Sequence, residues 1–429
     1  MIGIVMFFAA LVLLLLGFPV AFTFGGVALL FGLYAAGPDM FAFMPFRIFS
    51  IMENTVLMAI PLFIFMGIIL QKTELAAQLL ESMGKLFGSV RGGLAISTIL
   101  VGALLAASTG VVGASVVAMG LISLPVMLKF NYDKRLACGT ICAAGTLGQI
   151  IPPSIILIIL GDVMGIPVGD LFKAAVGPGL VLIGVYVAYI LIKSFLHPEV
   201  APAMPMDEDL DHRHEQYIRA LKAVLPPLVL ILVVLGSIFA GIATPTESSA
   251  LGGFGALLLA LFYRQFSWSM LFESAMETVK VTAMVFAILL GATAFSMTFT
   301  YSGGDLIVEE ILSNLPGNHM GFLILSMVVI LVLGFFIDFV EISFIIVPML
   351  APVAENLGIA PLWFAILIAM NLQTSFLTPP FGFSLFYLKG VAPPEVRTID
   401  IYRGVLPFIL MQIAIVITIL LFPGLYGLA

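Results

Sequence analysis

The sequence has little charge, few cysteines and no Walker-type glycine loop. Only 10% of its 429 residues are charged, against roughly a quarter in soluble domains. The net charge of −7 argues against a nucleic-acid partner. The two cysteines, Cys138 and Cys142, lie one helical turn apart in an apolar segment, which favours two small core residues over a metal or redox pair. The absent glycine loop indicates that ATP does not drive this protein.

Hydrophobic residues make up 62% of the chain, in runs of 16 or more. Each run is long enough to cross a bilayer core of roughly 30 Å as a tilted helix, and lipid leaves no other partner for backbone amides. The sequence therefore predicts an all-α polytopic membrane protein. The ten predicted spans lie at about 2–17, 19–36, 56–71, 136–160, 175–195, 223–242, 248–263, 281–300, 361–388 and 404–427.

Two further apolar stretches, 92–128 and 321–353, are too long for one span and hold small or polar residues in their middle. We interpret each as a re-entrant hairpin. With the N-terminus outside, this layout puts 15 of the 17 Lys and Arg on the inside and leaves only Arg47 and Lys173 outside. Treating either hairpin as a full span would reverse all later segments and lose this positive-inside bias.

The stretch 197–222 is proline-rich, then acidic, and too short to form a core, so it is predicted as a cytoplasmic linker with a short surface helix. It separates residues 1–196 from 223–429. Both halves also hold a predicted amphipathic interfacial arm rich in aromatic residues, at 47–53 and 263–277.

Three features of the first half recur in the second. Glu53 is echoed by Glu277 at an offset of 224, Pro125 by Pro348 at 223, and the first proline pair by the second at 227. One hairpin opens inward between basic residues and the other outward between acidic ones, so the halves are inverted. Inverted repeats are typical of secondary transporters whose sites lie at broken helices near the bilayer midplane.

The proline pairs Pro152–Pro153 and Pro379–Pro380 predict two broken helices, within 136–160 and 361–388, because proline removes a backbone donor and clashes with the preceding turn. Hydroxyls and amides cluster at both breaks and at the first hairpin tip. They are Thr146, Gln149 and Ser154; Gln373, Thr374, Ser375 and Thr378; and Ser108, Thr109 and Ser115 beside Gly113. Such oxygens suit Na⁺, and half-helix N-termini suit an anion. The alternative is that these small residues only assist helix packing.

The second hairpin tip, residues 334–343, carries Asp338 and Glu341. Carboxylates at this depth are costly and by default mark an ion or substrate path. Asp338 would ligate a cation or carry a proton, and Glu341 would do either or brace the tip. The alternative is that both cap half-helix N-termini.

The runs AASTGVVGASVVAMGLISLPVM, AAGTLGQIIPPSIILIILGDVMGIPVGDLF, FIDFVEISFIIVPMLAPV and NLQTSFLTPPFGFSLFYLKGVAP resemble the large membrane subunit of TRAP transporters, the tripartite ATP-independent periplasmic systems of bacteria and archaea. The resemblance covers essentially the whole chain. It implies an elevator-type transporter in the inner membrane that uses Na⁺ to take up an organic anion such as a C4-dicarboxylate, a 2-oxo acid or a sugar acid. It also implies a separate small membrane subunit and a periplasmic substrate-binding protein as partners.

Position by position, the resemblance implies one Na⁺ site formed by Ser108, Thr109, Gly113, Thr146 and Gly148. A second would be formed by Gly334, Asp338, Thr374 and Thr378, with substrate between the two tips. The polar residues left over are candidate substrate ligands: Ser115, Gln149, Ser154, Glu341, Gln373 and Ser375.

Two other functions stay open. An ion-coupled carboxylate symporter of the same architecture would work without a binding protein. An intramembrane enzyme would need a cluster of His, Cys or carboxylate groups at depth, for which the sequence offers Asp338, Glu341 and the two cysteines.

Overall fold

A computed structural model describes all of residues 1–429 except 74, 110–111, 204–209 and 429. For helical residues 75–77, 85, 106–109, 210–217 and 219 it describes the backbone alone. The described residues form helices joined by short turns, without a β-strand. By length and composition, six of these helices could each cross a membrane, and several shorter apolar helices accompany them.

The first half holds two opening helices, an interfacial helix, a hairpin and a broken helix. Its elements are α1 (Ile2–Leu15), α2 (Val20–Ala36), η1 (Pro38–Phe43), α3 (Met44–Met52), α4 (Ala59–Lys72), α5 (Leu75–Phe87), α6 (Gly93–Thr109), α7 (Val112–Lys129), α8 (Lys134–Thr146), η2 (Leu147–Gln149), α9 (Ile155–Met164) and α10 (Val168–Leu196). Hairpin 1 is α6 with α7, and break 1 is residues 147–154 between α8 and α9.

The second half repeats this order. Its elements are α11 (Leu210–Phe239), α12 (Pro245–Phe262), α13 (Trp268–Tyr301), α14 (Gly304–Ser313), α15 (Asn318–Leu333), α16 (Phe339–Glu341), the π-helical turn η3 (Ile342–Ile346), α17 (Val347–Asn356), α18 (Pro361–Leu377), α19 (Phe383–Val391), α20 (Thr398–Leu421) and η4 (Pro423–Tyr426). Hairpin 2 is α15 to α17, and break 2 is residues 378–382 between α18 and α19.

The predicted hairpins and broken helices are confirmed, and three boundaries differ from the prediction. The helix expected inside the linker is the first part of α11, which begins at Leu210 and continues into the span. The second arm is the N-terminal part of α13 instead of a separate helix. Helices α5 and α14, which precede the two hairpins, were not predicted.

The two arms differ in how the chain continues after them. Asn54 Oδ1 accepts hydrogen bonds from the backbone amides of Val56 (2.9 Å) and Leu57 (3.4 Å), and this turn separates α3 from α4. At the equivalent place in α13, Thr278 donates its hydroxyl back to the Ser274 carbonyl (2.8 Å), which a continuous helix tolerates. Lys72 then pairs with Glu273 (3.2 Å) and Glu277 (3.0 Å), joining the arm part of α13 to the end of α4.

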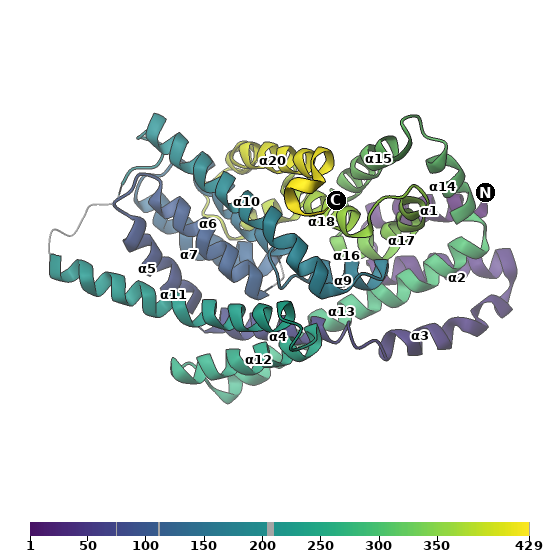
Figure 1. Cartoon of the computed structure of the whole chain (residues 1–429), viewed down its shortest axis with the longest axis horizontal. Coiled ribbons are helices and arrows are strands. Elements are labelled where there is room, and N and C mark those ends of the chain that lie inside the picture. The colour runs from purple at the N-terminus through teal and green to yellow at the C-terminus, as the bar shows by residue number, and fades with distance from the viewer. Residues whose placement is uncertain (74, 110–111, 204–209, 429) are drawn as a thin grey trace.

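Outside the hairpins, helices of the first half of the chain pack against helices of the second half. Helix α2 lies along α13, and its counterpart α12 lies along α4 (Figure 1). Glycine permits these approaches: a Cβ added at Gly291 of α13 would lie 2.6 Å from the Ala21 carbonyl oxygen of α2. We call α2, α4, α12 and α13 the crosswise frame. Figure 1 also shows hairpin 1 and hairpin 2 in opposite halves of the long axis.

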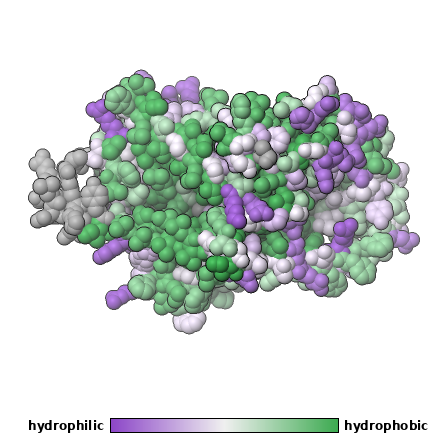
Figure 2. Space-filling model, viewed as in Figure 1, coloured by the Kyte–Doolittle hydropathy of each residue, from purple (hydrophilic) through white to green (hydrophobic). Residues whose placement is uncertain are grey.

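Large apolar side chains cover the exterior. Phe22 is 80% exposed and Phe262 is 90% exposed, and Figure 2 shows hydrophobic residues over much of one face, with hydrophilic residues gathering toward the end where α14 and the N-terminus lie. Soluble monomers rarely expose contiguous apolar patches beyond a few hundred Å². This surface is therefore one that contacts lipid or a membrane partner.

Helices α8 and α20 make the tightest helix crossing in the broken-helix region. A Cβ added at Gly139 would lie 2.1 Å from the Gly404 carbonyl oxygen, and one at Gly404 would lie 2.1 Å from the Arg135 carbonyl oxygen. The two cysteines lie on the same helix, buried and unbridged, with Cys142 Sγ 3.7 Å from the Ser384 carbonyl oxygen. They behave as small core residues, as the sequence predicts.

Replacing Gly404 by Ala should destabilise the protein by roughly 1–3 kcal/mol, because the new methyl group forces α8 and α20 apart. Thermal unfolding in detergent, followed by loss of the monodisperse chromatographic peak, measures the effect. Gly184→Ala is the matched control, since a Cβ there meets no atom within 4 Å. Equal melting temperatures for the two variants would contradict the tight crossing.

Candidate functional site

A serine hydroxyl bridges each helix break. Ser154 Oγ donates to the Gln149 carbonyl (2.6 Å), and Ser384 Oγ donates to the Phe376 carbonyl (2.8 Å). Both acceptors lie three residues before the first proline of their pair, and both proline pairs have a cis peptide bond. The freed carbonyls thus have partners inside the protein, which is the condition for irregular backbone at membrane depth.

The threonines and serines of the breaks donate to their own helices. Thr146 donates to the Ala143 carbonyl (2.9 Å), Thr374 to Met370 (3.0 Å), and Thr378 to Thr374 (2.7 Å). Ser375 donates likewise to Leu372 (2.7 Å). A hydroxyl that donates its hydrogen keeps oxygen lone pairs free, so these oxygens can still accept a hydrogen bond or coordinate a cation.

The two glutamine side chains at the breaks are different. Gln149 is 1% exposed and Gln373 is 0% exposed, and neither amide has a hydrogen-bond partner among the described residues. A buried unpaired polar group costs about 1–3 kcal/mol, and native proteins hold few of them. Two such amides at the two breaks indicate a place built to receive a polar ligand.

Hairpin 1 packs on break 1 and on the far side of break 2. Helix α6 contacts η2, which includes Gly148, and α7 contacts both α8 and α19. A Cβ at Gly113 would lie 2.7 Å from the ring of Tyr387 on α19, so only glycine lets the tip approach this ring. Ser115 is buried in α7. The predicted ligands Ser108 and Thr109 lie outside the side chains that the structure describes.

Hydrogen bonds hold the open end of hairpin 1, opposite its tip. The Tyr132 hydroxyl accepts a hydrogen bond from the Leu94 amide (3.2 Å), and burial raises the pKa of Tyr132 to about 12. The amides of Gly92 and Asp133 donate to the carbonyls of Ala201 (3.0 Å) and Val200 (2.9 Å) at the start of the linker. Because Tyr132 stays neutral at physiological pH, this support does not depend on pH there.

Hairpin 2 packs on break 2 in the corresponding way. A Cβ at Gly334 would lie 2.2 Å from Ser375 Oγ, so Gly334, predicted as part of a Na⁺ site, is in contact with Ser375, predicted as a substrate ligand. The ring of Phe336 lies 5.2 Å from that of Phe381 inside break 2. The tip and the break therefore form one packed unit.

The two carboxylates of hairpin 2 lie close enough to interact with one another. Asp338 Oδ1 accepts from the Phe339 amide (2.6 Å) and caps α16, which is the capping role the sequence left open. No described residue donates a hydrogen bond to its second oxygen, Oδ2. Glu341 is 3% exposed, and its Oε2 has no partner in the described part of the chain. The π-helical turn η3 follows at once, and such turns are frequent at functional sites.

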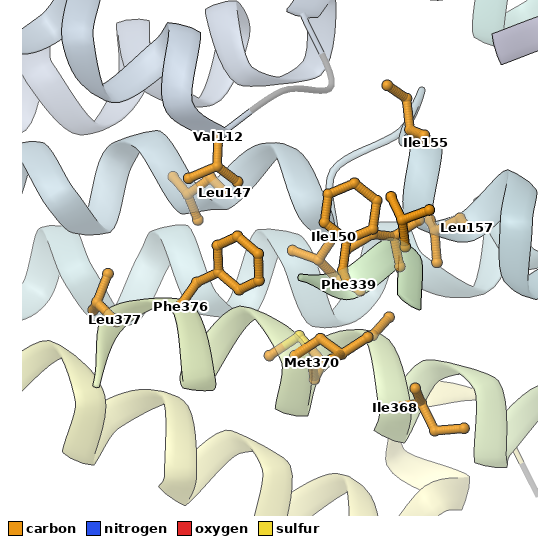
Figure 3. Close-up of a cluster of buried hydrophobic side chains, with 14 of the residues drawn as sticks. Val112, Leu147, Ile150, Ile155, Leu157, Phe339, Ile368, Met370, Phe376 and Leu377 are labelled. Atoms are coloured by element: carbon orange, nitrogen blue, oxygen red, sulfur yellow. The ribbon is translucent and has the colours of Figure 1, made fainter. Parts of the chain in front are cut away.

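Both tips and both breaks meet in one apolar cluster. Figure 3 shows Val112 of hairpin 1, Leu147 and Ile150 of break 1, Phe339 of hairpin 2 and Phe376 beside break 2 converging from different elements. The Phe339 and Phe376 rings lie 6.1 Å apart. The cluster shields a set of polar groups from lipid and water, which strengthens any charge interaction among them.

The sequence reasoning missed Tyr387 and Ser384. Tyr387 lies against the Gly113 backbone of hairpin 1 and is close enough to Asp338 of hairpin 2 to interact with it electrostatically. The available signal was that both residues follow a proline pair in the run FGFSLFYLKG, where they are the hydroxyl-bearing side chains.

Inverted repeats, paired hairpins and two internally braced helix breaks define a membrane transport protein. Residues 7–425 match the family described as the DctM component of the tripartite ATP-independent periplasmic transporter. The chain belongs to this family, and it is a transport subunit, not an enzyme.

The chain is similar in sequence to two transporter subunits and in fold to one solved structure. The C4-dicarboxylate TRAP transporter large permease protein DctM of Pseudomonas aeruginosa is 31% identical, over 90% of this chain and 89% of the relative. The isethionate TRAP transporter permease protein DctMQ of Oleidesulfovibrio alaskensis is 29% identical over 94% of this chain, which spans 62% of that relative. The YdaH transporter of Alcanivorax borkumensis shares the fold, with a TM-score of 0.60 at 15% identity over 87% of this chain and 86% of that one.

Replacing Gln373 by Met should raise thermal stability, because an unpaired buried amide is removed, yet lower uptake of the transported anion about tenfold, because a ligand contact worth roughly 1.4 kcal/mol is lost. Proteoliposome uptake and thermal unfolding of the same preparations measure both. Ser326→Ala is the control: this hydroxyl of α15 is also buried without a partner among the described residues, and it is not one of the candidate site residues. A stability gain with unchanged uptake in both variants would remove Gln373 from the site.

Proposed function

We propose that this chain is the large permease subunit of a Na⁺-coupled TRAP transporter that takes up a small organic anion across the inner membrane. The observation that carries the proposal is the pair of unsatisfied glutamine amides, Gln149 and Gln373, beside hydroxyl oxygens at two matched breaks. Relatives that act on a C4-dicarboxylate and on isethionate support an anionic substrate.

The first cation site would lie between hairpin 1 and break 1. Thr146 and Gly148 offer a hydroxyl and a backbone carbonyl there, and hairpin 1 contacts both α8 and η2. The second would lie between hairpin 2 and break 2, with Gly334, Asp338, Thr374 and Thr378. Hydroxyls and carbonyls suit Na⁺, and Asp338 has an oxygen left after capping α16.

The anion would lie between the two tips. Helices α9 and α19 both begin inside the breaks, and their free N-terminal amides and dipoles favour negative charge. The buried amides of Gln149 and Gln373 would donate to the anion, and Tyr387 would close the space between the tips. Ser154 Oγ already donates its hydrogen across break 1, so in its predicted contact with substrate it would accept from a donor group of the substrate, such as a hydroxyl.

Movement would follow the elevator scheme. The hairpins and breaks form one packed unit, while α2, α4, α12 and α13 form the crosswise frame around it. Sliding the unit against this frame would expose the tips to each side in turn. One charge crossing 100 mV supplies about 2.3 kcal/mol, so two net positive charges per anion would drive substantial accumulation.

The partners would be a small membrane subunit, a periplasmic binding protein and membrane lipid. The DctMQ relative is longer than this chain, consistent with a small subunit joined to the same chain there. The positive-inside distribution supports a periplasmic N-terminus and a cytoplasmic linker in a bacterial or archaeal inner membrane.

Replacing Thr146 or Thr374 by Val should raise the Na⁺ concentration for half-maximal uptake about tenfold, because each loses a cation ligand worth roughly 1.4 kcal/mol. Na⁺ titration of uptake in proteoliposomes measures this. Thr98→Val is the matched control, since Thr98 makes the same type of bond, to the Leu94 carbonyl (2.8 Å), far from the tips. Unchanged Na⁺ dependence in both site variants would contradict the assignment of Thr146 and Thr374 as Na⁺ ligands.

Uptake by this chain with its small subunit should require both an inward Na⁺ gradient and the cognate binding protein. A panel of labelled organic acids, added outside with and without that protein, would identify the substrate. Uptake with Na⁺ alone would instead favour the stand-alone symporter. Uptake driven by a proton gradient alone would contradict Na⁺ coupling and make Asp338 the candidate proton carrier.

A further inference from the structure

A second polar space lies away from the breaks. A cavity of about 370 Å³ opens between α3, the turn before α4, the end of α9, the C-terminal part of α13 and the inner limb of hairpin 2. Its volume is in the range of small-molecule sites. None of the residues that line it belongs to the candidate Na⁺ or substrate sites described above.

One cationic side chain lines this cavity. Arg47 of α3 is exposed, and no ion pair to it is formed within the part of the chain that the structure describes. In the orientation proposed above, Arg47 is also one of two basic residues on the outer side, against the positive-inside bias. A guanidinium binds carboxylates through paired, charge-assisted hydrogen bonds.

An acid lines the same cavity and is held in place. Asp162 Oδ1 accepts a hydrogen bond from Asn54 Nδ2 (2.5 Å), and Asn54 is itself fixed by the amides of Val56 and Leu57. Asp162 and Arg47 do not pair with one another, so the cavity offers a separate cationic and a separate anionic group.

Hydroxyl groups line the wall formed by α13. Thr293, Ser296 and Tyr301 all face the space, and Thr293 donates to its own helix at Leu289 (2.7 Å), leaving lone pairs to accept. Together with Asp162, these oxygens accept hydrogen bonds from a ligand that carries donors. A ligand with two carboxylates would find a cationic partner for one of them, Arg47, and none for the other among the residues that line the cavity.

We propose that this cavity is an outer receiving site for a hydroxylated monocarboxylate, with Arg47 binding the carboxylate and Asp162 accepting from a hydroxyl. The assignment rests on the anion uptake and orientation proposed above. A dicarboxylate without hydroxyls would place its second charge against Asp162, and this like-charge contact rejects it. The cavity thus selects for one negative charge plus hydrogen-bond donors.

The test is protection of Arg47 from phenylglyoxal, read by peptide mass spectrometry. The chain with its small subunit is held in phosphatidylcholine nanodiscs without any Na⁺ gradient, so the outcome is independent of transport. D-gluconate should slow modification of Arg47 several-fold, and succinate should not. Arg264, which is exposed and lies outside the cavity, should react at the same rate in every case.

Variants separate the two groups. Asp162→Asn keeps an oxygen for Asn54 and removes the charge, so succinate should then protect Arg47 as well as gluconate does. With Arg47→Gln, uptake of the cognate substrate should show a several-fold higher half-saturation concentration; Arg47→Lys should restore part of this loss. Lys173→Gln removes the other outer charge without touching the cavity and should change nothing.

Three results would overturn the proposal. They are absence of protection by gluconate, equal protection by succinate in the unchanged protein, and protection by added phosphatidylglycerol alone, which would make Arg47 a lipid contact. None of these results bears on Na⁺ coupling at the breaks, which the titration of Thr146→Val and Thr374→Val decides separately.

Discussion

Backbone amides and carbonyls within a bilayer must form hydrogen bonds inside the protein. The two helix breaks are possible only where this condition is met. Each proline pair interrupts a helix at depth, and Ser154 or Ser384 donates across the gap to the carbonyl three residues ahead of the prolines. The hairpins then pack on the helices that flank break 2, through Gly334 against Ser375 of α18 and Gly113 against Tyr387 of α19. Without these braces the carbonyls of Gln149 and Phe376 would be buried without this hydrogen bond.

The candidate site contains two kinds of polar side chain: hydroxyls that already donate a hydrogen bond, and amides that have no partner among the described residues. The hydroxyls of Thr146 and Thr374 are committed as donors yet can still act as acceptors, whereas the amides of Gln149 and Gln373 have no partner in the described protein. The first group suits a cation and the second can donate to an anion. A transporter that couples the two needs both kinds of group close together, and the cluster in Figure 3 brings their elements to one place.

Hydropathy and proline pairs suffice to predict the spans, hairpins and breaks, because lipid imposes helix length and excludes irregular backbone elsewhere. The remainder depends on tertiary contacts. Glu53 and Glu277 open equivalent motifs, yet α13 is continuous while α3 and α4 are separated by a turn in which Asn54 Oδ1 accepts from the Val56 amide. Tyr387 could not be found from its position on α19, because its significance comes from the Gly113 backbone of hairpin 1, which lies far from it in the sequence.

The walls of the outer cavity belong to both sides of the proposed movement. Helix α13 is part of the crosswise frame, held at its other end by Lys72 to Glu273 and Glu277. Asp162 ends α9, which begins at break 1 and would move with the hairpins. The bond from Asn54 to Asp162 therefore joins frame and moving unit, and sliding must break it. An anion held between Arg47 and Asp162 would be released or passed on by that same displacement, which links arrival of substrate to the start of transport.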